Sequence, residues 1–234
     1  MIAPGVIAAV HVGSITRLEN AGRGGRGLMT AFRKLPVAGA IAVGTMGLAG
    51  DAQANRRYHG GPEKAVYGYP VSGYAGWRAD FPDIADAFGP GAMGENLVIT
   101  GQDEADICIG DIIRCGSATL QVSQIREPCS TLAAVLGTRH VVRAMVRTAR
   151  CGRYYRVIES GTIGAGDAHH VIERPNPHWS VDRFARHVAT RGGDAAAWRE
   201  LATLPGLTPE WRIRAAAALG SPGASALPTI PPAR

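Results

Sequence analysis

The chain has 234 residues, of which 46% are apolar and 19% charged, a balance typical of a folded globular protein rather than a disordered one. No apolar run approaches the roughly 18 residues that a membrane-spanning helix needs. The first residues lack the basic and apolar regions of a secretory signal, so we expect a cytoplasmic protein that does not contact a membrane. The formal net charge of +6 favours anionic partners such as phosphorylated small molecules, nucleic acid or acidic proteins.

Short apolar runs, separated by glycine, aspartate and serine, dominate the first three quarters of the chain. They predict strands at residues 5–13, 37–43, 64–69, 96–100, 107–114, 118–125, 153–159 and 169–173. Helices are predicted between them at residues 71–81, 130–136 and 140–149. Many short strands at close spacing indicate a mostly β fold with some helices, either a barrel or a sandwich.

Towards the C-terminal end the sequence pattern predicts helices. Ser180 and Asp194 can each cap a helix, and Thr208 followed by Pro209 is a strong start signal for a third helix that ends near residue 219. Proline-rich sequence then predicts disorder. The predicted domains are a β-rich domain at 1–175, a three-helix module at 176–219 and a disordered tail at 220–234.

Four cysteines are present, and no two form the Cys-x-x-Cys pair of a common zinc site. Cys108 and Cys115 lie on predicted strands and read as buried apolar residues, whereas a role for Cys151 stays open. Cys129 differs, because it follows Pro128 at the start of a predicted helix. Its position at a helix N-terminus near Arg126 favours the thiolate, which can act as a nucleophile or as a soft metal ligand.

Two further segments concentrate polar residues. In the first, His59 precedes Gly60-Gly61-Pro62 and Lys64, and its paired glycines could let backbone N–H groups approach an anion. The alternative is a loop whose glycines only satisfy turn geometry. In the second, Glu95 and Asn96 enter an apolar strand. They could hydrogen-bond a polar heterocycle or simply form the turn that starts the strand.

In their order and spacing these segments resemble the molybdenum cofactor sulfurase C-terminal (MOSC) domain family, over residues 5–175. The resemblance is carried by Gly47-Leu48-x-Gly50-Asp51-x-Gln53, His59-Gly60-Gly61-Pro62-x-Lys64-Ala65-Val66, Gly94-Glu95-Asn96-Leu97, Ile109-Gly110-Asp111, Pro128-Cys129, Gly152-x-Tyr154-x-Arg156-Val157, Gly161 and Gly166-Asp167. The last three predicted helices resemble a module that follows this domain in bacterial stand-alone members.

The resemblance implies a β-barrel and a binding site for the molybdenum cofactor, a pterin dithiolene with a terminal phosphate. Cys129 matches the family's cysteine and would be the thiolate ligand of molybdenum. From charge and position, we expect His59, Lys64 and Arg126 to meet the phosphate and pterin. Glu95 and Asn96 are expected to hydrogen-bond the cofactor or line its pocket.

Similar stand-alone proteins reduce N-hydroxylated compounds such as hydroxylaminopurines, amidoximes and hydroxylamines, which makes this reaction the leading hypothesis. His59 and Glu95 are the candidate proton donors. No flavin, haem or nicotinamide motif is visible, so an external reductase or ferredoxin-like protein would supply electrons. Members often carry an aromatic residue where this chain has Arg153, which predicts a substrate mouth suited to anionic molecules.

Two other functions compete with the reductase hypothesis. Cys129 could carry sulfur as a persulfide, or hold the cofactor transiently, without turnover. The positive charge and the terminal helices suggest nucleic-acid binding as a further possibility. No known binding motif is visible, however, and we expect no nucleic-acid partner.

Overall fold

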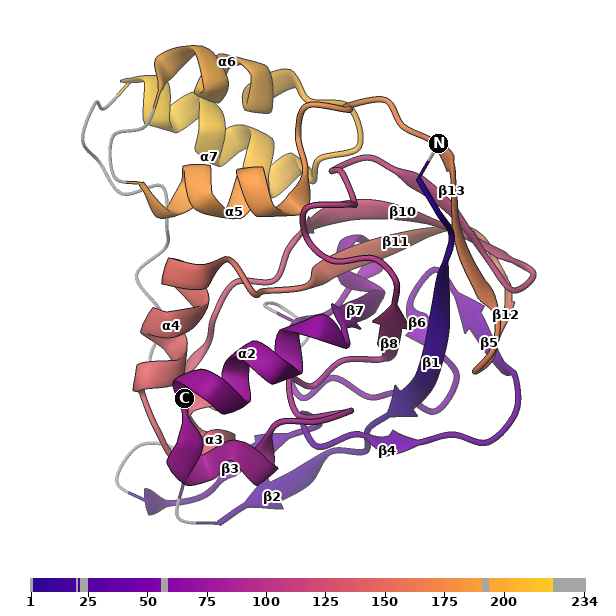
Figure 1. The fold of residues 1–234 in the computed structure, drawn as a ribbon, viewed down its shortest axis with the longest axis vertical. Coiled ribbons are helices and arrows are strands. Elements are labelled where there is room, and N and C mark those ends of the chain that lie inside the picture. Colours follow the sequence, from indigo (N-terminus) through magenta and orange to yellow (C-terminus); the bar gives the residue numbers. More distant parts are fainter. Residues whose placement is uncertain (1, 20, 22–24, 56–58, 191–193, 221–234) are drawn as a thin grey trace.

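A computed structural model, which describes residues 2–19, 21, 25–55, 59–190 and 194–220, contains a closed β-barrel (Figure 1). The seven barrel strands, in spatial order, are β13 (Ala168–Glu173), β9 (Ile112–Cys115), β10 (Ala118–Ile125), β11 (Arg153–Glu159), β7 (Val66–Pro70), β8 (Leu97–Thr100) and β1 (Gly5–Val12). Pairing of β1 with β13 closes the barrel, and only β7 and β8 run parallel. The predicted mostly β fold is confirmed, as a barrel rather than a sandwich.

Apolar side chains of the barrel strands form the core. Ile7, Ile99, Ile113 and Leu120 come from four different strands and have no exposed surface. Burial of such a side chain stabilises the fold by about 1.5–3 kcal/mol. Strand β10 has the predicted bounds, because its run of branched apolar residues stops at Ile125, just before the turn that leads to Pro128.

Two predicted strands differ from the structure by more than two residues at one end. Of the run at 37–43 only the end forms a strand, β5 (Ile41–Gly44), because Gly39 has a φ of 75° and turns the chain before it. The two-residue strand β4 (Leu35–Pro36) precedes the run and was not predicted. The run at 107–114 becomes a strand only at Ile112, since Gly110, with a φ of 86°, belongs to a turn.

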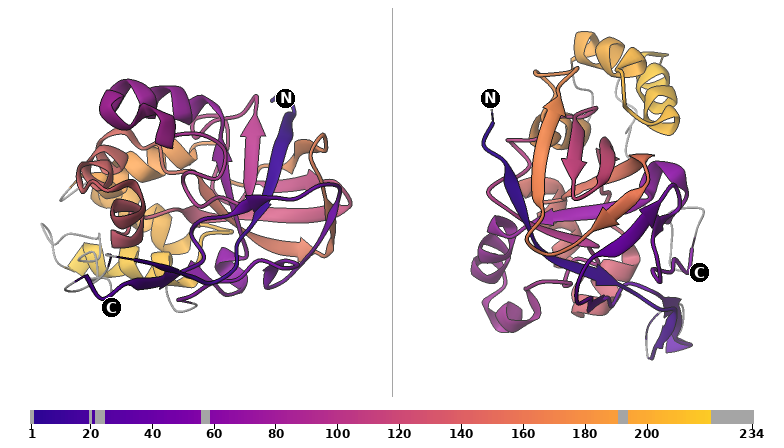
Figure 2. Two further views of the ribbon diagram at one scale, coloured as in Figure 1. Left: turned by 90° about the horizontal axis from the view of Figure 1, so that it is seen from below. Right: turned by 90° about the vertical axis from the view of Figure 1, so that its right-hand side faces the viewer.

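Outside the barrel, the short strands other than β5 were not predicted. A hairpin is formed by β2 (Thr16–Leu18) and β3 (Leu28–Thr30), and a small sheet by β12 (Gly161–Ile163), β5 and β6 (Gly47–Leu48). The hairpin lies at the end of the molecule opposite the last two helices (Figure 1, Figure 2).

The predicted helices are confirmed. They are α2 (Ser72–Asp80), α3 (Ser130–Leu136), α4 (His140–Thr148), α5 (Val181–Ala189), α6 (Ala195–Thr203) and α7 (Pro209–Gly220), with short 3-10 turns at Pro62–Lys64 and Pro82–Ala87. Ser180 and Asp194 accept the predicted capping bonds from Arg183 N (3.1 Å) and Ala196 N (2.9 Å). None of the helices in the described ranges is long and apolar enough to cross a membrane.

The three C-terminal helices bury aromatic residues between them. The rings of Phe184 in α5 and Trp211 in α7 meet edge to face, with centroids 5.0 Å apart. The buried residues of these helices also join the barrel core in one continuous apolar cluster. The boundary at 175/176 stays a prediction, and the predicted tail lies, from residue 221 onwards, outside the described residues.

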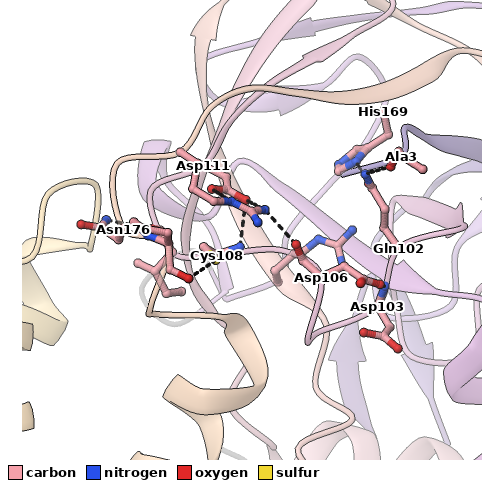
Figure 3. A network of polar contacts seen from close by, with 12 residues as sticks. Ala3, Gln102, Asp103, Asp106, Cys108, Asp111, His169 and Asn176 are labelled. Carbon is pink, nitrogen blue, oxygen red and sulfur yellow. Dashed lines mark hydrogen bonds and ion pairs between the residues drawn. The ribbon is translucent and has the colours of Figure 1, made fainter. Parts of the chain in front are cut away.

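Arg153 lies inside the barrel, which contradicts its predicted place at a substrate mouth. Its side chain has no exposed surface, and its Nε donates to the Tyr155 hydroxyl (2.6 Å). That hydroxyl contacts His169 (2.9 Å), which in turn contacts Gln102 (2.6 Å; Figure 3). Side chains alternate across a strand, so Arg153 and Tyr155 share the interior face while Tyr154 faces the other way. The predicted preference for anionic substrates therefore loses its basis.

Asp111 joins the barrel to the segment that leads to α5 (Figure 3). Its fully buried carboxylate accepts hydrogen bonds from Cys108 N (2.8 Å) and from Arg174 Nε (2.9 Å) and Nη2 (2.5 Å).

We predict that Arg174→Met lowers the free energy of unfolding by about 3 kcal/mol, because it leaves the buried carboxylate of Asp111 without its counter-charge. Urea denaturation measures this effect. The control is Arg114→Met, which breaks an exposed ion pair with Glu159 and should cost less than about 1 kcal/mol; equal costs would contradict the prediction.

Candidate functional site

Cys129 lies at the end of the loop that connects β10 to α3. Its extended backbone (φ −136°, ψ 162°) makes it the N-cap residue of α3, directly after Pro128. Pro128 cannot extend a strand ladder, so the chain leaves the barrel here and turns into the helix. The side chain is half-buried, unlike those of the three other cysteines, which are buried. The prediction that Cys108 and Cys115 are buried is confirmed.

Arg126 is the charged neighbour of the Cys129 sulfur. Its side chain is only 4% exposed, and its Nη2 lies 3.5 Å from the Cys129 Sγ. The guanidinium also lies over the rings of Phe32 and Tyr67, at 5.6 and 5.3 Å from their centroids. Such contacts stabilise a cation away from water, so the positive charge is held permanently beside the sulfur.

His59 completes the surroundings of the sulfur. Burial by itself raises the pKa of Cys129, but the Arg126 guanidinium and a hydrogen bond with His59 outweigh burial and lower the pKa from 9.0 to about 5. Cys129 is therefore a thiolate at neutral pH. The other cysteines differ, since burial raises the pKa of Cys108 to about 11 and that of Cys115 to about 12.

These pKa values predict selective modification of the metal-free protein. Iodoacetamide at pH 6.5 should form a single adduct, located at Cys129 by peptide mass spectrometry, because only a thiolate reacts. Since the pKa of Cys129 is lowered, its reactivity should persist at neutral pH and disappear as the pH falls through about 5. Free cysteine in the same buffers, titrating near pH 8.5, is the control. A Cys129 midpoint above pH 8 would contradict the prediction.

A buried ion pair that the sequence did not reveal lies near Arg126. Lys34 pairs with Asp51, which also accepts a hydrogen bond from Gly13 N (2.8 Å). Burial lowers the pKa of Lys34, and Arg126 lowers it further, whereas Asp51 raises it. His11 lies nearby with its Nδ1 unpaired among the described residues. The sequence signals were that Asp51 belongs to the motif Gly47-Leu48-x-Gly50-Asp51-x-Gln53 and that Lys34 is one of just two lysines in the chain.

Glu95 and Asn96 make scaffold contacts in the structure. Glu95 has no exposed surface and accepts hydrogen bonds from Tyr74 Oη, Gly91 N (2.6 Å) and Met93 N (2.9 Å). Asn96 accepts from Tyr67 N and donates to His11 O, each at 3.1 Å, and so links three barrel strands.

The predicted contacts of these two residues with a cofactor or a substrate stay a prediction. Their oxygen and nitrogen atoms are occupied by loop and strand partners. His59 thus stays as the better-placed candidate proton donor.

Lys64 lies at the edge of a cavity of about 240 Å³. Residues 60–64, Gln124 and residues 208–210 line this cavity, between the glycine loop and the start of α7. Gln124 is 1% exposed, and its Oε1 has no hydrogen-bond partner among the described residues. A buried polar atom without a partner costs free energy, which a polar ligand or water in the cavity would relieve.

Comparisons with known proteins identify relatives of this chain. A family model described as "MOSC domain" matches residues 55–170. The chain is 35% identical over 203 residues to a "Reductase" of Gibberella moniliformis, covering 86% of this chain and 35% of that protein. It is 36% identical over 148 residues to "Protein YiiM" of Escherichia coli, covering 63% of this chain and 66% of that one. The chain thus spans about a third of the first relative and just under two thirds of the second.

A solved structure of similar length extends the likeness to the whole fold. YiiM from Geobacillus stearothermophilus superposes with a TM-score of 0.76 at 30% identity, covering 92% of this chain and all of that one. The sequence and the fold are both similar to those of MOSC proteins, and the chain belongs to the MOSC domain family.

Proposed function

We propose that this protein uses the molybdenum cofactor to reduce N-hydroxylated compounds, with Cys129 as the thiolate ligand of molybdenum. The substrates would be hydroxylaminopurines, amidoximes or hydroxylamines. An N–OH group, two electrons and two protons give N–H and water. The observation that carries the proposal is the Cys129 thiolate, held between Arg126 and His59 in a protein of this family. The relative named "Reductase" agrees with a redox role.

The residues around Cys129 fit this cofactor. A thiolate is the soft donor that suits a metal already bound by dithiolene sulfur. Arg126, His59 and Lys64 provide positive or hydrogen-bonding groups for a phosphate and a pterin. Gln124 offers to a heterocycle a buried amide oxygen that has no partner in the described part of the chain. The bound cofactor would supply Lewis acidity and the capacity to exchange two electrons.

The protein's own groups have separate tasks in this proposal. Arg126 keeps Cys129 deprotonated, which a metal ligand must be. His59, which lies beside the sulfur, would deliver a proton to the hydroxyl as the N–O bond breaks. Two electrons must then come from another protein, for which we propose an external reductase or a ferredoxin-like donor.

The deciding experiment measures molybdenum in protein purified from a host that makes the cofactor. We expect nearly one molybdenum per chain and, with a chemical reductant, turnover of a hydroxylaminopurine or an amidoxime. A loaded protein that reduces neither would contradict the substrate class. The molybdenum content is read independently of turnover, so cofactor and substrate are tested separately.

The same thiolate also supports the sulfur- or cofactor-carrier alternative. A cysteine that is ionised at neutral pH attacks and holds sulfur readily. Folded protein without molybdenum, despite adequate cofactor supply, and with a persulfide on Cys129 detected by mass spectrometry would favour the carrier over the reductase.

A further inference from the structure

Helix α7 contacts both chain segments that carry the site. One is the loop of residues 126–129 that presents Cys129, and the other is the glycine loop that runs from His59 to Lys64. The two segments are far apart in the sequence. Helix α7 is distant from both in the sequence, since it begins some 80 residues after Cys129, yet it contacts both in the fold. A single helix across two loops can fix their relative position.

The first contact is an ion pair with two hydrogen bonds. Arg214 of α7 donates from Nη1 to Glu127 Oε2 (3.0 Å) and from Nη2 to Glu127 Oε1 (2.9 Å). Both side chains are about four-fifths buried, with exposed fractions of 17% and 21%. Such bidentate pairs are directional, so they fix geometry as well as supplying energy. Glu127 adjoins Arg126, whose Nη1 donates to the Glu127 carbonyl (2.7 Å).

The other contacts lie one helical turn earlier. Glu210 approaches Lys64 at 3.5 Å, and Thr208 N donates to Ser123 O (3.1 Å) on β10, just before the loop that carries Cys129. The helix itself is well anchored. Trp211 is fully buried, and the Arg214 guanidinium lies 3.5 Å from the centre of its ring.

We propose that α7 is a brace for the site and that Arg214 is a positioning residue, which holds the loop of Cys129 through Glu127. This assigns a task to the three-helix module. It rests on the proposed function only where cofactor retention is concerned. Arg214 acts through Glu127 and Arg126, so its loss should loosen the loop without unfolding the barrel.

The experiment compares Arg214→Ala with Arg212→Ala, a matched control on the exposed side of the same helix. Hydrogen exchange, followed by mass spectrometry, should show about tenfold faster exchange in residues 126–133 of Arg214→Ala, the loss expected for a charged hydrogen-bonded pair. Exchange in β1 and β8 should not change. Of the two alanine variants, only Arg214→Ala should lose molybdenum, by several-fold. Arg214→Lys should retain an amount between those of wild type and Arg214→Ala, because lysine keeps the charge but cannot donate the two parallel hydrogen bonds to Glu127.

A double-variant comparison checks the partner. Glu127→Ala should loosen the same segment, and adding Arg214→Ala should have little further effect on exchange in residues 126–133, because both remove the Glu127–Arg214 pair. Arg214 also contacts Glu210 (3.8 Å) and Trp211, which lie within α7. The brace is overturned if Arg214→Ala and Arg212→Ala exchange alike in residues 126–133. It is also overturned if exchange rises equally in the barrel strands, which would mean general destabilisation. Wild-type protein without molybdenum would contradict the proposed function alone, since the exchange comparison needs no cofactor.

Discussion

Cys129→Ala is expected to abolish molybdenum retention and N-hydroxyl reduction while the protein stays folded. Removal of the only proposed protein ligand should weaken metal binding by more than about 100-fold, since even residues that merely support a ligand contribute about 10–100-fold. The stability cost should be about 1–2 kcal/mol. The half-buried thiol contributes little packing, but Arg126 loses its anionic partner.

Elemental analysis, turnover and thermal unfolding measure these effects. Cys108→Ala serves as the control, because that thiol is buried away from the site and contacts Pro177 O at 3.6 Å. This control should keep its molybdenum. Wild-type metal content in Cys129→Ala would refute the ligand assignment, and an unfolded Cys129→Ala would show that the cysteine is a core residue.

The fold was largely predictable because its signals are local. Strands β10 and β11 and helix α3 have the predicted bounds, since runs of branched residues end at clear turn signals. The hairpin β2–β3 was missed because three-residue strands are too short to show a period. The wrong place for Arg153 has a different cause: from the sequence alone it was not clear which face of β11 points into the barrel.

The site was predictable only in part, for a related reason. Arg126 and Cys129 are three residues apart, so their contact could be read from the sequence. His59 reaches the sulfur only because the fold brings the glycine loop to the loop of Cys129. Lys34 and His11 were not predicted at all. The fold brings Lys34 to Asp51 and near Arg126, and it brings His11 near Lys34. Long-range contacts leave no periodic trace in a single sequence.

Arg126→Met is expected to reduce molybdenum retention in a way that depends on pH. Methionine can pack against Phe32 and Tyr67 but cannot stabilise the thiolate, so burial should raise the pKa of Cys129 from about 5 towards 9.0, with His59 as the remaining group that lowers it. At pH 7 only about 1% of a thiol with that pKa is ionised, which weakens metal binding about 100-fold.

The sign of the pH effect separates this explanation from simple damage to the site. Because a raised pKa is overcome by raising the pH, Arg126→Met should regain molybdenum when reconstituted near pH 9.5, whereas wild type should bind equally well from pH 7 to 9.5. Arg126→Lys, which keeps a charge but not the planar guanidinium, should lie between them. Arg139→Met, on the exposed start of α4, should resemble wild type.

The pH at which Cys129 of Arg126→Met becomes half-reactive towards iodoacetamide decides between the two neighbours of the sulfur. If this midpoint stays near pH 5, His59 rather than Arg126 stabilises the thiolate. His59→Gln should then show the pH-dependent loss of molybdenum instead.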